Sequence, residues 1–319
     1  MKNRFERTAT TEYQGRRLPK PNEELVDQGL AFDLGTAVSR RRLLALFGAG
    51  AGVAGAGLLA RGAGAFASTS PATSVPTSEI PEETAGPYPG DGSNGPDVLE
   101  QSGIVRSDIT TSFGDATGVA GGVPTTLEFL VYDLANGGVP FEGVAVYAWH
   151  CTSDGGYSMY SEGFENENYL RGVQIADADG KVTFTSIFPG CYAGRWPHVH
   201  FEVYPDEASI TDSANAIATS QLAFPADVCS VVYAEEGYEA SVSNLANVSL
   251  DTDGIFSDDS AGTQLATMTG DVASGYHASL SVGIDTTTAA GGGGMSGGGM
   301  PSGAPPSGGP GDPTATTTA

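Results

Sequence analysis

The chain has 319 residues, of which 46 are glycine, and it carries a formal net charge of −24 at pH 7. Ten of its 14 lysine and arginine residues precede residue 68, so the rest of the chain has four cations against 32 aspartate and glutamate residues. Such an acidic surface repels phosphate backbones and anionic lipids, which argues against nucleic acid as a partner. We interpret the excess negative charge as a means of keeping the protein in solution.

The amino-terminal segment carries the features of an export signal. Residues 1–38 are polar and are predicted to form a disordered leader. Ser39–Leu44 form a twin-arginine pattern, an apolar run rich in glycine and alanine follows over 45–60, and a small-x-small sequence comes after it at Ala65–Ala67. This order of basic, apolar and small residues is typical of a signal peptide.

We therefore expect residues 39–67 to be a twin-arginine signal peptide that is cleaved after Ala67, with residues 68–83 as a linker. The Tat export machinery would be a partner, and the protein would be extracellular or in the cell envelope. A transmembrane anchor is the alternative, because the apolar run approaches the length that spans a bilayer. Its glycines and alanines make it only mildly hydrophobic, so no stable membrane anchor is expected.

Residues 84–285 are predicted to form one all-β domain. Short apolar or alternating runs, each closed by turn residues, cover 126–133, 144–150, 181–188 and 198–204. Strands of this length, with no long helical period between them, indicate an antiparallel β-sandwich or barrel, of which we expect the sandwich. A short helix is expected over 226–234, and a last strand is expected over 275–282.

The carboxyl-terminal residues 286–319 are almost all Gly, Ser, Pro, Thr or Ala. They are predicted to be disordered, because such a segment cannot bury enough apolar surface to offset the entropy lost on ordering. Three cysteines, Cys151, Cys191 and Cys229, lie in the exported part of the chain, where a disulfide is permitted. Three single-bridge pairings are possible, and the sequence leaves the choice among them open.

His198 and His200 are candidate metal ligands. In a strand, side chains at i and i+2 point to the same face, so both imidazoles would project together toward one ion. Zinc, copper and iron all remain possible for such a pair. A cupin would place a glutamate four or five residues after the second histidine, where this chain has Tyr204 and Pro205. An Fe(II) site of two histidines and one carboxylate remains an alternative, with Glu202 on the same face.

Several motifs surround this histidine pair in a fixed order. They are Gly86–Pro89, Val146–Ser158 with its Gly-Gly-Tyr-Ser ending, Leu170–Gly172, Asp177–Gly180, Ile187–Phe201 with its Pro-Gly-Cys-Tyr and Arg-Trp-Pro-His-Val-His sequences, and Ser220–Leu222. Together they resemble the intradiol dioxygenase family, which includes catechol 1,2- and protocatechuate 3,4-dioxygenases, over roughly residues 84–224. The resemblance implies the β-sandwich core of that family.

The resemblance also implies Fe(3+) as the cofactor, with Tyr157, Tyr192, His198 and His200 as its ligands. Tyrosine is a poor ligand for most divalent ions because the pKa of its phenol is about 10. Two phenolates offset much of a 3+ charge inside a protein, which two neutral imidazoles alone do not, so this ligand set favours the ferric state.

Three residues are expected to act in catalysis on the same basis. Arg195 takes the place of the family's active-site arginine and would stabilise negative charge that develops on the ring. Gln221 lies where the family keeps a substrate-pocket glutamine, and Tyr157 is assigned as the ligand that the substrate displaces. Two features depart from the family pattern: five residues separate Tyr192 from the first histidine, which shortens the loop that shapes the pocket, and Tyr147 replaces an expected acidic residue.

The activity that the resemblance implies is the insertion of both atoms of O2 into a catechol-type aromatic, which gives a cis,cis-muconate-type diacid. Two alternatives stay open: a secreted β-sandwich binding module that retains the fold without turnover, and an Fe(II) or Zn His-x-His metalloprotein. His150 and His277 lack partners at metal-ligand spacing and are assigned structural roles.

Overall fold

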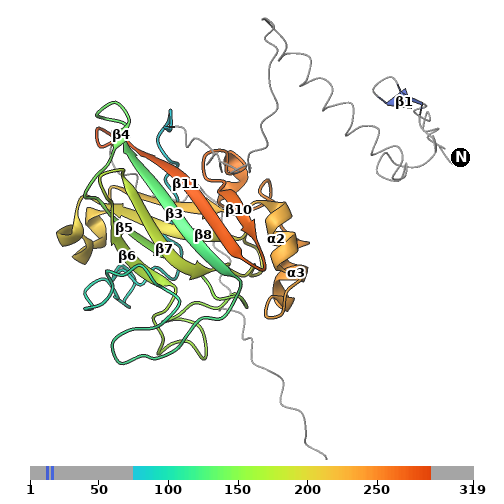
Figure 1. The fold of residues 1–319 in the computed structure, drawn as a ribbon, viewed down its shortest axis with the longest axis horizontal. Coiled ribbons are helices and arrows are strands. Elements are labelled where there is room, and N and C mark those ends of the chain that lie inside the picture. Colours follow the sequence, from blue (N-terminus) through green and yellow to red (C-terminus); the bar gives the residue numbers. More distant parts are fainter. Residues whose placement is uncertain (1–11, 14–15, 18–74, 289–319) are drawn as a thin grey trace, which may run out of the picture. The chain divides into compact units, whose positions relative to one another are not determined.

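The computed structural model describes residues 12–13, 16–17 and 75–288 of the chain (Figure 1). The chain divides into two compact units, Met1–Ser68 and Thr69–Ala319. In the first unit, the short strands β1 (Glu12–Tyr13) and β2 (Arg16–Arg17) pair antiparallel. The predicted signal peptide and residues 289–319 of the predicted tail lie outside the described residues.

Two sheets build the second unit. In the larger sheet the strand order is β10–β11–β3–β4, and β7 also pairs with β3; in the smaller sheet the order is β6–β5–β8–β9. The strands of the larger sheet are β3 (Pro124–Asp133), β4 (Val139–Pro140), β7 (Lys181–Ile187), β10 (Thr267–Asp271) and β11 (Gly275–Ile284). Those of the smaller sheet are β5 (Ala145–Trp149), β6 (Arg171–Ile175), β8 (His198–Tyr204) and β9 (Ala218–Ala223).

Few helices accompany the sheets. Among residues 75–288 the α-helices are α2 (Ala226–Val232) and α3 (Glu239–Leu245), and the 3-10 helices are η2 (Glu207–Thr211), η3 (Ser213–Asn215) and η4 (Phe256–Asp258). Within the described part of the chain, every helix is too short or too polar to cross a bilayer.

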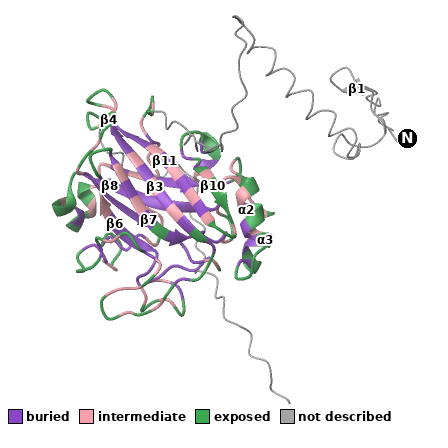
Figure 2. Cartoon of the chain, in the orientation of Figure 1, coloured by how far each residue is buried: buried purple, intermediate pink, exposed green. Residues whose placement is uncertain are grey.

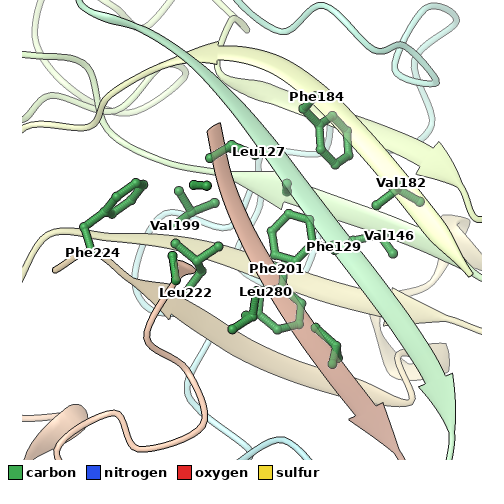
Figure 3. Close-up of a cluster of buried hydrophobic side chains, with 14 of the residues drawn as sticks. Leu127, Phe129, Val146, Val182, Phe184, Val199, Phe201, Leu222, Phe224 and Leu280 are labelled. Atoms are coloured by element: carbon green, nitrogen blue, oxygen red, sulfur yellow. The ribbon is translucent and has the colours of Figure 1, made fainter. Parts of the chain in front are cut away.

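The two sheets pack face to face around an apolar core. Alternate residues of β3 are buried, which is the pattern of a strand with one face against a core (Figure 2). Phe129 and Phe184 from the larger sheet meet Phe201 and Leu222 from the smaller one in a single cluster (Figure 3). The rings of Phe129 and Phe201 lie 5.0 Å apart between centroids. This packing is the β-sandwich that the alternating runs predict.

The predicted antiparallel arrangement is wrong for one pair of strands. β11 runs parallel to β3, with Leu280 opposite Phe129, whereas the other pairings in both sheets are antiparallel. Parallel neighbours need a long connection, and most of the domain lies between these two strands in the sequence. A pattern of alternation reports which face of a strand is buried but carries no information on its direction.

The other expected elements are found close to their predicted bounds. The four predicted strands correspond to β3, β5, β7 and β8, the predicted helix to α2 and the last predicted strand to β11. β6 and β9 were not predicted, because Arg171–Ile175 and Ala218–Ala223 mix small and polar residues without a clear period of two. The cysteines Cys151, Cys191 and Cys229 are buried and free, so the permitted disulfide is not formed.

The smaller sheet is covered on both of its faces. All five residues of β5 and all seven of β8 are buried. One face packs against the larger sheet, and the other face is covered by long connections that precede β3 and follow β5. A sheet buried twice in this way can hold polar side chains on its second face only where they find partners.

Candidate metal centre

The two histidines of β8 project from the face of the smaller sheet that is turned away from the larger one. Val199 and Phe201, which alternate with them, pack in the core between the sheets. The Nε2 atoms of His198 and His200 are 3.0 Å apart. The Nδ1 atom of His198 lies 2.5 Å from the carbonyl oxygen of Trp196, which only accepts, so Nδ1 carries the proton and Nε2 keeps its lone pair.

Two phenols converge on these imidazoles from separate loops. Tyr192 follows β7, and its Oη lies 3.3 Å from Nε2 of His198. Tyr157 follows β5, and its ring centroid lies 5.9 Å from that of Tyr192 and 6.4 Å from that of His200. The Oη atom of Tyr157 is buried and has no hydrogen-bond partner. The four side chains that the sequence singles out as ligands are therefore gathered in one place.

The ring of His200 packs against two neighbours. Trp149 is paired with His200 across β5 and β8, and the two rings stack at 5.0 Å with an interplanar angle of 6°. The backbone at Gly86 also approaches this ring, so closely that an added Cβ would lie 3.3 Å from Cε1 of His200. Gly86 also has a φ of 72°, so both the conformation and the space favour glycine there.

Burial sets the protonation of the four side chains. It lowers the pKa of both His198 and His200 well below the ordinary value, and the nearby Arg195 lowers both further. Burial raises the pKa of Tyr157 well above that of a free phenol and that of Tyr192 to about 12, while Arg195 acts in the opposite direction on both. Neutral imidazoles and an unpartnered phenol oxygen that converge in a buried site fit a metal cation, whose charge would favour the phenolates.

The atoms that could bind a metal here restrict which ion would fit. Within the described residues, no three His, Cys, Asp or Glu side chains lie close enough to hold a metal. Glu202 follows the histidines on the same face of β8, but its carboxylate accepts a hydrogen bond from Tyr204 Oη at 2.7 Å instead of completing a ligand set with them. The two-histidine, one-carboxylate alternative is therefore not assembled. Phenol oxygens are hard donors, which suit a hard and highly charged cation.

Arg195 lies at the edge of this group and is fixed by two side chains. Its Nη2 donates to Oε1 of Gln221 at 2.6 Å, and its Nε donates to Oδ2 of Asp253 at 2.9 Å. Gln221 is paired with His200 across β8 and β9 and donates from Nε2 to the carbonyl of Thr84 at 3.0 Å. The three predicted catalytic residues, Arg195, Gln221 and Tyr157, thus lie with the predicted ligands.

Sequence reasoning missed Asp253. This carboxylate is completely buried, and besides Arg195 it accepts hydrogen bonds from the backbone N–H groups of Trp196, Ile255 and Phe256. No motif marks it, because it lies among several other acidic residues after α3. Its role follows only from the fold that brings this loop against Arg195.

The two remaining histidines lie outside the group. His150 is buried, with Nδ1 2.8 Å from the carbonyl of Cys151 and Nε2 2.7 Å from Oγ of Ser186. Burial lowers the pKa of His150 to about 4. His277 is half-buried, with Nε2 3.6 Å from a carboxylate oxygen of Glu128. Both positions agree with structural roles.

Comparisons of sequence and of structure with known proteins both find dioxygenases. Residues 94–234 match the sequence profile of a protein family described as "Dioxygenase". A stretch of 55 residues, 17% of this chain, is 38% identical to the chlorocatechol 1,2-dioxygenase of Rhodococcus opacus and spans 21% of that protein's length. An intradiol ring-cleavage dioxygenase from Tetranychus urticae is similar in structure, with a TM-score of 0.52 and 23% identity over 67% of this chain and 98% of the other. The chain shares the fold of that dioxygenase.

Proposed function

We propose that the protein is an exported intradiol dioxygenase, which uses Fe(3+) to insert both atoms of O2 into a catechol-type aromatic. The main support is the convergence of two phenols and two imidazoles. Nε2 of His198 lies 3.3 Å from Tyr192 Oη and 3.0 Å from Nε2 of His200. The match of residues 94–234 to a dioxygenase family supports it. The product would be a cis,cis-muconate-type diacid.

Tyr157, Tyr192, His198 and His200 would hold the ferric ion. The bound ion would supply the Lewis acidity that makes phenolates and a catecholate dianion accessible near neutral pH, and the covalency through which the catecholate reacts with O2. Tyr157 Oη is buried and has no hydrogen-bond partner, so as a phenolate ligand it would be free to take up a proton from the incoming catechol.

Arg195 would stabilise the negative charge that develops on the aromatic ring. Two of its nitrogens are engaged by Gln221 and Asp253, so the guanidinium is oriented before a substrate binds. A preorganised donor of this kind stabilises the transition state without reorganisation at the moment of reaction. Because the buried carboxylate of Asp253 pairs with it, the arginine does not bring an uncompensated charge into the site.

The ferric site is tested by colour and by ligand substitution. Phenolate bound to Fe(III) absorbs visible light, so protein loaded with ferric iron should be coloured, and Tyr192→Phe should weaken or shift the band. Oxygen electrode measurements over a panel of substituted catechols should give one O2 consumed per ring cleaved. A metal-replete sample that stays colourless and takes up no O2 would overturn the proposal in favour of a binding module without turnover.

Export by the twin-arginine route is the second part of the proposal. It rests on Ser39–Leu44, the apolar run and the Ala65–Ala67 sequence that follow in the expected order. Replacing Arg40, Arg41 and Arg42 together with lysine should leave the protein in the cytoplasm, while the unchanged chain is processed after Ala67 and recovered outside it. Cell fractionation and amino-terminal sequencing measure both. Normal export of the triple variant would refute this part and leave the enzymatic proposal intact.

A further inference from the structure

Arg171, at the start of β6, is a buried cation that the proposed reaction does not use. It is 1% exposed, and it forms no ion pair with any carboxylate among residues 75–288. All three of its nitrogens donate hydrogen bonds instead. These run from Nε to Ser158 Oγ at 3.0 Å, from Nη1 to Pro89 O at 2.7 Å and Tyr147 Oη at 3.1 Å, and from Nη2 to Tyr88 O at 2.9 Å and Ser158 O at 3.0 Å.

One group of these acceptors belongs to the loop that carries Tyr157. Ser158 is the next residue, and it offers both its hydroxyl and its carbonyl to Arg171. The same hydroxyl donates to the carbonyl of Tyr169 at 2.7 Å. The backbone on the carboxyl side of Tyr157 is therefore held by three hydrogen bonds that meet at one serine.

Besides Tyr147 on β5, the other acceptors are the carbonyls of Tyr88 and Pro89. These two residues belong to residues 84–90, named here the cover segment because they cross the metal centre. Within it, Thr84 accepts from Gln221, Gly86 lies against His200, and the ring of Tyr88 lies 5.0 Å from that of Tyr157. Its last residue is fixed as well, since the N–H of Gly90 donates to Tyr160 Oη at 2.9 Å. Arg171 thus joins the loop of one proposed ligand to the segment that packs on two of them.

Backbone strain is stored on both sides of this junction. Met159, next to Ser158, has a φ of 69°, and Leu170, next to Arg171, has a φ of 56°. A non-glycine residue in the left-handed region costs on the order of 1–3 kcal/mol and persists where its surroundings over-determine it. The hydrogen bonds of Arg171 and Ser158 are the surroundings that do so here.

We propose that Arg171 is a positioning residue for the metal centre: by bridging Ser158 to Tyr88 and Pro89, it sets where Tyr157 Oη lies relative to His198 and His200. Arginine suits the role because its planar fork carries five N–H donors, whereas lysine has three donors on a single nitrogen and cannot span both segments. The proposal rests on the proposed function in one respect, namely that Tyr157 is a ligand of the bound ion.

The first test follows iron binding in the full-length mature protein. Ser158→Ala removes the hydroxyl that links Arg171 to Tyr169 and leaves the fold of the sheet untouched, and Arg171→Lys keeps the charge but loses the fork. Substitution of a residue that orients a metal ligand typically lowers the metal affinity by about 10- to 100-fold. Both variants should bind ferric iron that much more weakly and shift the visible band. The matched control is Ser186→Ala, since Ser186 is also buried and, among the described residues, its hydroxyl bonds to His150 alone.

The second test needs no metal. Hydrogen exchange in the iron-free protein should rise together at the Gly90 amide and in residues 157–161 when Arg171 is replaced by lysine, because one side chain holds both segments. Arg106→Lys is the control: Arg106 also donates to backbone carbonyls, including those of Asn168 and Arg171, but contacts neither segment. It should raise exchange near residues 168–171 and leave exchange at the Gly90 amide and in residues 157–161 unchanged.

The outcomes separate this inference from the proposed function. If the unchanged protein binds iron with colour, and Ser158→Ala and Arg171→Lys keep both the band and the affinity, Arg171 has only a structural role and the inference is overturned. Separate exchange responses of the two segments would overturn it as well. If the unchanged protein itself shows no band, the proposed function fails, while joint loosening of both segments would still support the bridge. Should Arg171→Lys not fold, Ser158→Ala decides by the same readouts.

Discussion

The two faces of the smaller sheet differ in what covers them. The face toward the larger sheet carries Val146, Ala148, Val199 and Phe201 and is closed by the strands of that sheet. The opposite face carries Tyr147, Trp149, His198, His200 and Gln221 and is closed by loops, among them the cover segment. Both faces are buried, so burial alone does not distinguish a packing surface from a chemical one.

The smaller sheet therefore has an apolar face that stabilises the fold and an opposite face that carries the candidate site. On the apolar face each side chain contributes by leaving water, and the contribution depends on volume and shape. On the opposite face the buried groups are polar and each one requires a partner, so a side chain there is held by specific contacts such as the stack of Trp149 on His200. Substitutions on the two faces should therefore fail in different ways.

The largest effect on stability is expected on the apolar face. Phe201→Ala should lower the free energy of unfolding by about 3–5 kcal/mol, because it empties a fully buried site against Phe129 that the sheets cannot close. Urea unfolding of the iron-free protein measures the loss. Phe201→Leu, which keeps most of the volume, should cost much less. A loss below about 1 kcal/mol for the alanine variant would mean that this face is not the packing surface.

Among the residues at the candidate site that are not proposed ligands, Arg195 is expected to have the largest effect on kcat. Arg195→Ala should lower kcat by about 100- to 1000-fold, the loss typical of removing a preorganised donor from a developing charge, and should leave iron content and the visible band in place. Lys181→Ala is the control, since Lys181 is another of the domain's few cations and lies on β7 of the other sheet. Full turnover in Arg195→Ala would remove this residue from the catalytic group.

The two faces also differ in how far the sequence predicts them. The period of two in 126–133 predicts β3 with its buried face, and the run over 198–204 predicts β8, although both faces of β8 are buried. The histidine pair follows from the same geometry. The positions of Tyr157 and Tyr192 follow only from the resemblance of ordered motifs, since loops have no period from which a position could be calculated.

What the sequence does not predict depends on contacts between distant segments. The parallel pairing of β11 with β3 and the packing of Asp253 against Arg195 are examples. So is the bridge that Arg171 makes to Pro89, 82 residues away along the chain. Each of these residues could be replaced in the sequence without changing any local pattern, so only the assembled fold identifies them.

His150 is the one histidine that reaches into the space between the sheets. His150 continues the alternation of β5 toward the larger sheet, where Nε2 meets Ser186 of β7. Burial lowers its pKa from 6.5 to about 4, so the folded protein excludes a proton that the unfolded chain accepts. The contribution of His150 to the free energy of unfolding should be complete above pH 6.5 and should fall by about 3 kcal/mol as the pH drops to 4.

Urea unfolding of the iron-free protein at pH values from 7 to 4 measures this slope. His150→Gln removes the titrating group, so the fall between pH 6.5 and 4 should shrink by that amount even if the variant is less stable at pH 7. An unchanged slope in His150→Gln would show that other groups cause the acid lability.

The smallest effect is expected at the edge of the same sheet, where Glu82 accepts a hydrogen bond from the N–H of Thr219 in β9 at 3.3 Å. Burial raises the pKa of Glu82 from 4.5 to about 7, which the Thr219 N–H opposes and Glu79 reinforces. The folded state keeps a proton that the unfolded chain releases above pH 4.5, so stability should decline as the pH rises from 4.5 to 7 and level off beyond it. This slope is opposite in sign to that of His150. Glu82→Gln should equal the unchanged protein at pH 4 and exceed it modestly at pH 8, measured against exposed Glu100→Gln as the control for net charge.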